Sequence, residues 1–200
     1  MIRRPPRSTL DRSSAASDVY KRQGLALTNP VSDAEELVAT FLEWRNDERW
    51  LLLGGPAAVS DKQLWTAWLG LGSRHVNSNM RANGLDVEFI RLIAGTHQIR
   101  VGFERAGLAD GDQIAWLVYL PEFVDSTISE MNWPDLDRFA LDREADRLMR
   151  VINAKLLPHA PIPHEESVQR LELQVESDQS SDHDAIERSA LAHIALADFN

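Results

Sequence analysis

The sequence contains no cysteine. Disulfide bonds, thiolate metal sites and cysteine nucleophiles are therefore excluded, and a cytoplasmic location is the simplest interpretation. No apolar run approaches the roughly 18 residues that a membrane-spanning helix needs, so we expect no membrane partner. Acidic residues also outnumber basic ones, 31 to 21, which gives a formal net charge of −10. General binding to phosphates needs a basic surface, so we expect no DNA partner and only a local contact with RNA.

Motifs that identify common enzymes are also missing. The sequence has no Walker loop, no G-x-S-x-G elbow and no H-E-x-x-H helix. Gly70-Leu71-Gly72 lacks the third glycine of a dinucleotide loop, since position 75 is histidine. The six histidines are scattered without metal-ligand spacing, and no two carboxylates stand out as a catalytic pair. We therefore expect a protein that is not an enzyme, with no catalytic residue, no metal and no cofactor.

The chain nevertheless has the composition of a folded domain. Two hundred residues suit one domain, and 44% apolar residues with six tryptophans allow a real core. Strand-like and helix-like segments alternate irregularly, which favours α+β order over a doubly wound sheet. We predict an α/β (α+β) fold, a mixed or antiparallel sheet of four or five strands flanked by helices. The expected strands include 50–53, 113–120 and 168–175.

Residues 1–23 differ from the rest of the chain. They hold six Lys/Arg against two Asp, with several serines and prolines. An organelle transit peptide has a similar composition. The string RSSAASDVYKRQ also resembles translated sequencing-adapter read-through, which we favour. We therefore expect 1–23 to be a non-native or disordered basic tail, and 24–200 to be one domain with an acidic, serine-rich loop at 176–184.

The most informative stretch runs from residue 73 to 120. Apolar residues near helical period precede Gly95-Thr96, which breaks the pattern. Thr96 can cap the next turn by accepting a backbone N–H. A second short helix then precedes Gly107, and the apolar run 113–120 predicts a buried strand.

The motif Glu88–Leu92 (EFIRL), the break Ala94–Ile99 (AGTHQI) and the helix through Phe103–Gly107 resemble a known family. It is the small kinase-docking subunit of the KEOPS complex, also called the PRPK-binding protein, in its archaeal form. That family has a glutamate-led helix, a Ser/Ala-Gly-Thr-x-Gln-Ile break, a second helix and a strand. The ending His193–Asp198 is also similar, so the resemblance covers about residues 25–200.

The resemblance implies a non-catalytic subunit of a complex that makes threonylcarbamoyladenosine in tRNA. Such a subunit would bind the kinase-like ATPase subunit and would help to recruit tRNA by its single-stranded 3′ CCA end. Two alternatives stay open from the residues alone. One is a small hydrolase or ligand-binding α+β domain with no visible site, and the other is a structural adaptor without RNA contact.

Basic residues gather in the same stretch although the whole chain is acidic. They are either ordinary solvated side chains or a small patch in which guanidinium groups bind phosphate oxygens. Arg81, in the asparagine-rich segment 79–83, is the preferred contact, since it resembles an arginine-bearing turn of the family. The candidates for tRNA contact are Arg74, Arg81, Asn83, Arg91, His97 and Arg100.

Apolar residues of the two helices have two possible roles. They are either core or part of a docking surface beside the basic residues. The resemblance favours docking of the kinase-like subunit here. The candidates for partner binding are Ile90, Ile93, Gln98, Ile99 and Phe103.

Overall fold

The computed structural model describes residues 21–123, 136–176 and 179–199. The fold is α+β in a single domain, as the sequence predicted, with one four-stranded sheet in the order β2-β3-β1-β4. All three neighbouring pairs are antiparallel. The strands are β1 (Lys21–Leu27), β2 (Trp50–Gly54), β3 (Ile114–Tyr119) and β4 (Ala154–Leu157).

Strand β1 lies in the middle of the sheet between β3 and β4. Its Gly24 lies opposite Trp116, and a Cβ at Gly24 would come within 3.0 Å of the Trp116 ring. The described part of β1 starts at Lys21, inside the segment 1–23 that was expected to be a tail. Backbone pairing with β3 explains this, because polar side chains can join a strand that a neighbour's N–H and C=O groups complete. Residues 1–20 lie outside the described residues.

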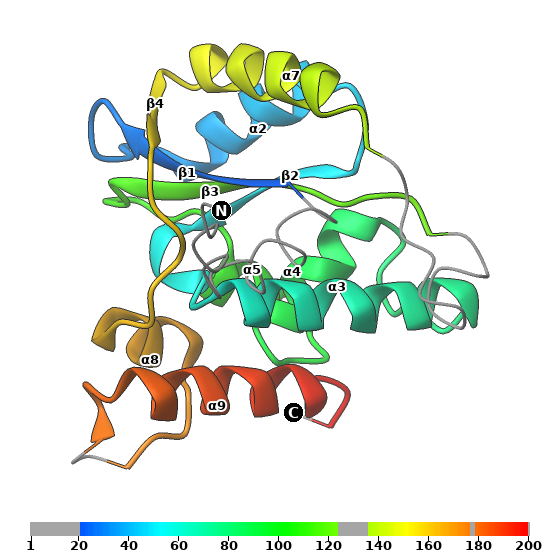
Figure 1. Cartoon of the computed structure of the whole chain (residues 1–200), viewed down its shortest axis with the longest axis vertical. Helices are drawn as coiled ribbons and strands as arrows, with labels where there is room; N and C mark the ends of the chain where they lie inside the picture. The colour runs from blue at the N-terminus through cyan, green and yellow to red at the C-terminus, as the bar shows by residue number, and fades with distance from the viewer. Residues whose placement is uncertain (1–20, 124–135, 177–178, 200) are drawn as a thin grey trace, which may run out of the picture.

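Helices cover both faces of the sheet (Figure 1). Helices α2 (Ala34–Trp44) and α7 (Arg138–Val151) lie on one face. The other face is covered by α3 (Asp61–Val76), α4 (Leu85–Ile93) and α5 (Ile99–Ala106). The short helix η1 (Gly55–Ala57) follows β2 and contacts β3, with Ala57 in the core. Outside it lie α8 (Glu165–Leu171), beside η1, and α9 (His183–Ala195), against α3 and α4.

Each face of the sheet has its own apolar cluster. Phe41 of α2 and Leu148 of α7 pack with alternate residues of the central strands. The opposite cluster is larger and contains Trp68 of α3, Phe89 of α4 and Ile194 of α9. No helix in the described part of the chain is long and apolar enough to cross a membrane.

The predicted strand at 168–175 was wrong, because its first part is α8. Val168 and Leu171 lie three residues apart and face the same neighbours, which a helix also satisfies. The chain continues from left-handed Glu172 (φ +53°) to Leu173, which is buried as well. Two apolar residues on a helix and one beyond its end thus imitate the alternation of a strand.

Candidate functional site

Three of the predicted RNA contacts converge on one carboxylate. Asp198 follows α9 and accepts a hydrogen bond of 2.7 Å from Nη2 of Arg74. Its other oxygen lies 3.1 Å from Nη2 of Arg91 and 3.4 Å from Nε of Arg81. We call these three arginines, together with Glu88 and Asp198, the arginine cluster. It joins the end of α3, the loop 77–84, α4 and the end of α9.

Arg91 forms the floor of the arginine cluster and not its surface. Arg91 and Glu88 are both 0% exposed and are joined by two hydrogen bonds, of 2.5 and 3.1 Å. Arg91 also donates to the carbonyls of Thr96 and Ala197. Burial alone would lower the pKa of Arg91, but Glu88 and Asp198 outweigh it and raise the pKa. The prediction that Arg91 contacts tRNA was wrong, because a buried guanidinium with four protein acceptors is not accessible.

Glu88 also orders the loop that carries Arg81. Its Oε2 accepts the backbone N–H groups of Arg81, at 3.2 Å, and Ala82, at 3.0 Å. The N-cap of α4 is Gly84, which has no side chain to cap the helix. A first-turn glutamate that reaches back to preceding N–H groups supplies the same kind of closure as a capping box. One buried carboxylate therefore fixes both Arg91 and the backbone of Arg81.

The rim of the arginine cluster is accessible. The side chain of Arg81 is 50% exposed and that of Asp198 is 34% exposed. Asn83, two residues after Arg81, is exposed as well. Burial would raise the pKa of Asp198, but the hydrogen bond from Arg74 and the charges of Arg74 and Arg91 hold it below its usual range. Three guanidinium groups face two carboxylates, so the arginine cluster keeps an excess of positive charge in an acidic chain.

The other two predicted RNA contacts lie in and after the turn that joins α4 to α5. His97 and Arg100 are both exposed. Arg100 pairs with Glu104 one turn further along α5, at 2.8 Å. Among the described residues, no hydrogen bond or ion pair joins Arg100 to the arginine cluster. The structure therefore brings together Arg74, Arg81 and Arg91, and leaves Arg100 outside the arginine cluster in its pair with Glu104.

The predicted partner-binding residues divide in the same way. Ile90 and Ile93 belong to the core, with 6% and 0% exposure, so their prediction as docking residues was wrong. The reason is that α4 is buried between α3, α5 and α9. Ile99 and Phe103 are 40% and 44% exposed, one turn apart on α5, and Gln98 is exposed at its N-cap. They leave an accessible apolar strip on α5.

The turn between α4 and α5 is closed by α9. Gly95 adopts φ +61°, and a Cβ there would lie 1.4 Å from the ring of His193. His193 donates from Nε2 to the carbonyl of Ala94 at 2.8 Å. Burial lowers the pKa of His193, and this effect outweighs the hydrogen bond. Oγ1 of Thr96 accepts a backbone N–H as predicted, that of Gln98 at 3.1 Å, but the N-cap of α5 is Gln98 and not Thr96. Glycine at 95 is thus required by both conformation and space.

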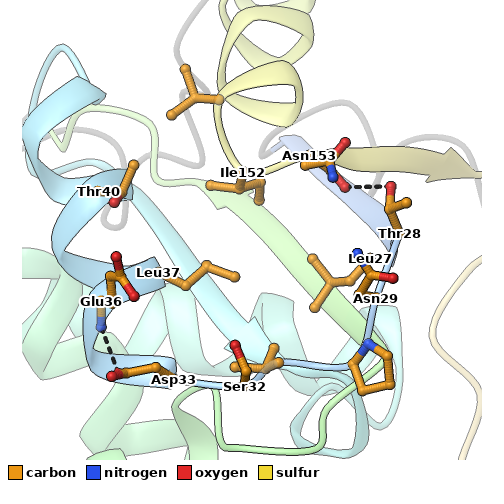
Figure 2. Close-up of a pocket in the computed structure, with 13 residues that line it drawn as sticks. Leu27, Thr28, Asn29, Ser32, Asp33, Glu36, Leu37, Thr40, Ile152 and Asn153 are labelled. Atoms are coloured by element: carbon orange, nitrogen blue, oxygen red, sulfur yellow. Dashed lines mark hydrogen bonds between the residues drawn. The ribbon is translucent and has the colours of Figure 1, made fainter.

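A shallow hollow of about 280 Å³ lies on the other side of the molecule, between α2, β1 and the end of α7 (Figure 2). Asp33 is engaged there as the N-cap that accepts the N–H of Glu36, and Thr28 donates to the carbonyl of Asn153. A second open hollow beside β4 contains His159. No group of three or more His, Asp or Glu side chains placed to hold a metal occurs among the described residues.

Comparison with protein-family models and with curated proteins finds no match for this chain. The resemblance to the KEOPS subunit accordingly rests on the motif around Gly95 and remains a prediction. Sequence reasoning missed two members of the arginine cluster, Glu88 and Asp198. The i, i+3 spacing of Glu88 and Arg91 was a usable signal for an ion pair. Nothing in the sequence pointed from Arg91 to a residue 107 positions later.

Proposed function

We propose that this chain is a non-catalytic, KEOPS-type adaptor that binds the single-stranded CCA end of tRNA and a kinase-like ATPase subunit. In this proposal the protein is cytoplasmic, and it recruits tRNA for threonylcarbamoyladenosine synthesis. The observation that carries the proposal is the accessible rim of the arginine cluster. Arg81 offers a half-exposed guanidinium group, and Arg74, whose side chain is 18% exposed, lies beside it and also donates to the carbonyl of Gly70. This local excess of positive charge stands in a chain that as a whole repels nucleic acid.

An unpaired RNA end suits such a small rim. Two or three guanidinium groups can bind the phosphates of a few nucleotides, whereas a duplex needs a broad basic face. The exposed side chain of Phe199 follows Asp198 directly and offers a ring on which a base can stack. Phosphate contacts and one stacking surface are the elements that single-strand recognition uses.

The partner half of the proposal rests on α5. Ile99 and Phe103 form an accessible apolar strip, flanked by the charged pair Arg100 and Glu104. An apolar centre with a polar rim is the usual composition of a protein–protein interface. Arg91 packs against Gly102 of α5 and donates to the carbonyl of Ala197, so the residue that underlies the arginine cluster also contacts the helix that carries the strip.

The RNA half is tested by filter binding of intact tRNA and of tRNA without CCA. We expect weaker binding to the trimmed tRNA. We also expect Arg81→Glu to bind intact tRNA at least about tenfold more weakly, because it reverses a rim charge. Arg143→Glu on α7 is the matched control, with the same charge change on the opposite side. Equal affinity for intact and trimmed tRNA would overturn the RNA half.

The partner half is tested by co-expression with a cognate kinase-like subunit followed by size-exclusion chromatography. We expect a stable complex with the wild type and its loss in Phe103→Glu. Phe139→Glu is the matched control, because Phe139 is also exposed but lies on α7, across the sheet. A complex that survives Phe103→Glu but not Phe139→Glu would place the partner on the other face and contradict the proposal.

A further inference from the structure

Asp198 occupies the position that an anionic ligand of the arginine cluster would take. Its two carboxylate oxygens are contacted by all three guanidinium groups, at 2.7, 3.1 and 3.4 Å. Guanidinium groups bind carboxylate and phosphate oxygens alike. Here Arg74 donates a hydrogen bond to Oδ2 of Asp198, whereas Arg81 and Arg91 lie at ion-pair distance from Oδ1, which accepts no hydrogen bond from the described residues. A side chain that is one-third exposed and shares three arginines therefore resembles a bound anion more than an ordinary surface ion pair.

We propose that Asp198 is an internal competitor for this anion site. When Asp198 moves away, a phosphate group takes its place on Arg74 and Arg81. The inference rests on the proposed function only for the source of that phosphate, the backbone or end of a single-stranded RNA. The competition itself concerns the arginine cluster alone.

The two carboxylates of the arginine cluster differ in how easily they can leave. Glu88 is fully buried, binds Arg91 twice and accepts two backbone N–H groups. Asp198 lies in the turn after α9 and is partly exposed, and within the described ranges its side chain forms ion pairs with arginines alone. Glu88 therefore stays bound to Arg91, while Asp198 can be exchanged for another anion at the rim.

The chain end does not need the Asp198 side chain to stay in place. Arg91 donates to the carbonyl of Ala197 at 3.1 Å, and Ala197 itself is fully buried. Arg81 donates to the backbone carbonyl of residue 198 at 3.4 Å. A substitution that removes only the carboxylate should therefore leave the turn docked and expose the positive rim.

Competition has a measurable consequence. If Asp198 fills the site most of the time, the affinity for an external anion falls by the fraction of molecules in which the site is open. A tethered group acts at a high effective concentration, so a tenfold reduction is a reasonable scale. Removal of the carboxylate should therefore raise the affinity for an external anion by the same factor.

The experiment compares wild type, Asp198→Asn and Asp198→Ser by calorimetric titration with inorganic pyrophosphate, after circular dichroism has verified the fold. We expect both variants to bind pyrophosphate about tenfold more tightly than the wild type. Glu122→Gln is the matched control, because it removes one negative charge from another arginine pair, that with Arg49. Its affinity should equal that of the wild type.

A second titration with a short RNA ending in CCA separates this inference from the proposed function. Tighter binding of both pyrophosphate and RNA by the Asp198 variants supports both. Tighter binding of pyrophosphate without any RNA binding supports the competition and overturns RNA as the source of the phosphate. Unchanged or weaker pyrophosphate binding by folded variants of Asp198, or an equal gain in Glu122→Gln, overturns the competition even if the wild type binds RNA.

Discussion

Two helices on opposite sides of the sheet carry the same Glu-x-x-Arg pair in different surroundings. Glu88 and Arg91 on α4 are joined at 2.5 Å, and so are Glu144 and Arg147 on α7. In both pairs Nε and Nη2 of the arginine bind the two carboxylate oxygens. The α4 pair is fully buried, whereas the Arg147 side chain is more than one-third exposed.

The difference shows how burial changes the role of one interaction. Exposed ion pairs contribute at most about 1 kcal/mol, because water screens the charges in both states. A buried pair is tolerated only when every charge is matched, and removal of one partner leaves an uncompensated charge. The α4 pair therefore holds the arginine cluster together, while the partly exposed α7 pair joins α7 to the end of α2 through the contacts of Arg147 with Trp44 and Asn46.

The largest expected effect comes from breaking the two pairs in the same way. Glu88→Gln should lower the free energy of unfolding by about 3 kcal/mol or more, because Arg91 loses its main counter-charge while buried. Glu144→Gln should lower it by less than about 1 kcal/mol. Urea denaturation of both variants measures the difference. Equal losses would mean that burial does not separate the two pairs.

A second comparison uses two glycines with positive φ. Gly95 (φ +61°) faces the His193 ring, whereas Gly111 (φ +88°) has nothing within 4 Å of an added Cβ. Gly111→Ala should cost about 1 kcal/mol of stability from backbone strain alone. Gly95→Ala should cost about 2 kcal/mol more, because α9 must move away. If thermal unfolding gives equal losses, α9 does not press on this turn.

A smaller effect should appear as the pH changes. The pKa of His193 lies below its usual 6.5, because burial outweighs the hydrogen bond to Ala94, with Arg105 lowering it and Glu172 opposing. As the pH falls below about 6.5, this histidine binds a proton in the unfolded chain more readily than in the folded chain. The free energy of unfolding therefore decreases as the pH falls. Unfolding at pH 8 and pH 5.5 should show a smaller acid loss in His193→Gln than in the exposed control His159→Gln.

The sequence predicted the parts of the fold that strong local patterns determine. The apolar runs at β2 and β3 were recognised, because a buried strand has few polar residues. The central strand β1 was not predicted at all, since residues 21–23 are basic or polar and the strand conformation is completed by pairing with β3. Pairing across about 95 residues has no local signature.

The candidate site was predicted only in part, for a related reason. The spacing of charges on a helix indicates which residues are neighbours, but not whether another element covers them. Arg91, Ile90 and Ile93 were among the candidates for surface contacts, with a core role left open for the isoleucines, and all three are buried because α3, α5 and α9 pack around α4. Arg74 and Arg81 were placed correctly in one group, although the carboxylate that joins them, Asp198, comes from the far end of the chain.

The most direct test of the central claim is the salt dependence of tRNA binding. Each phosphate contact with a single strand contributes about 0.7 to the slope of log K against log salt. We predict that Arg81→Gln reduces this slope by about 0.7, because the proposed function has Arg81 contact one phosphate at the rim. Arg147→Gln, from the exposed pair on α7, should leave the slope unchanged. An unchanged slope in Arg81→Gln would contradict the assignment of the rim as the RNA site.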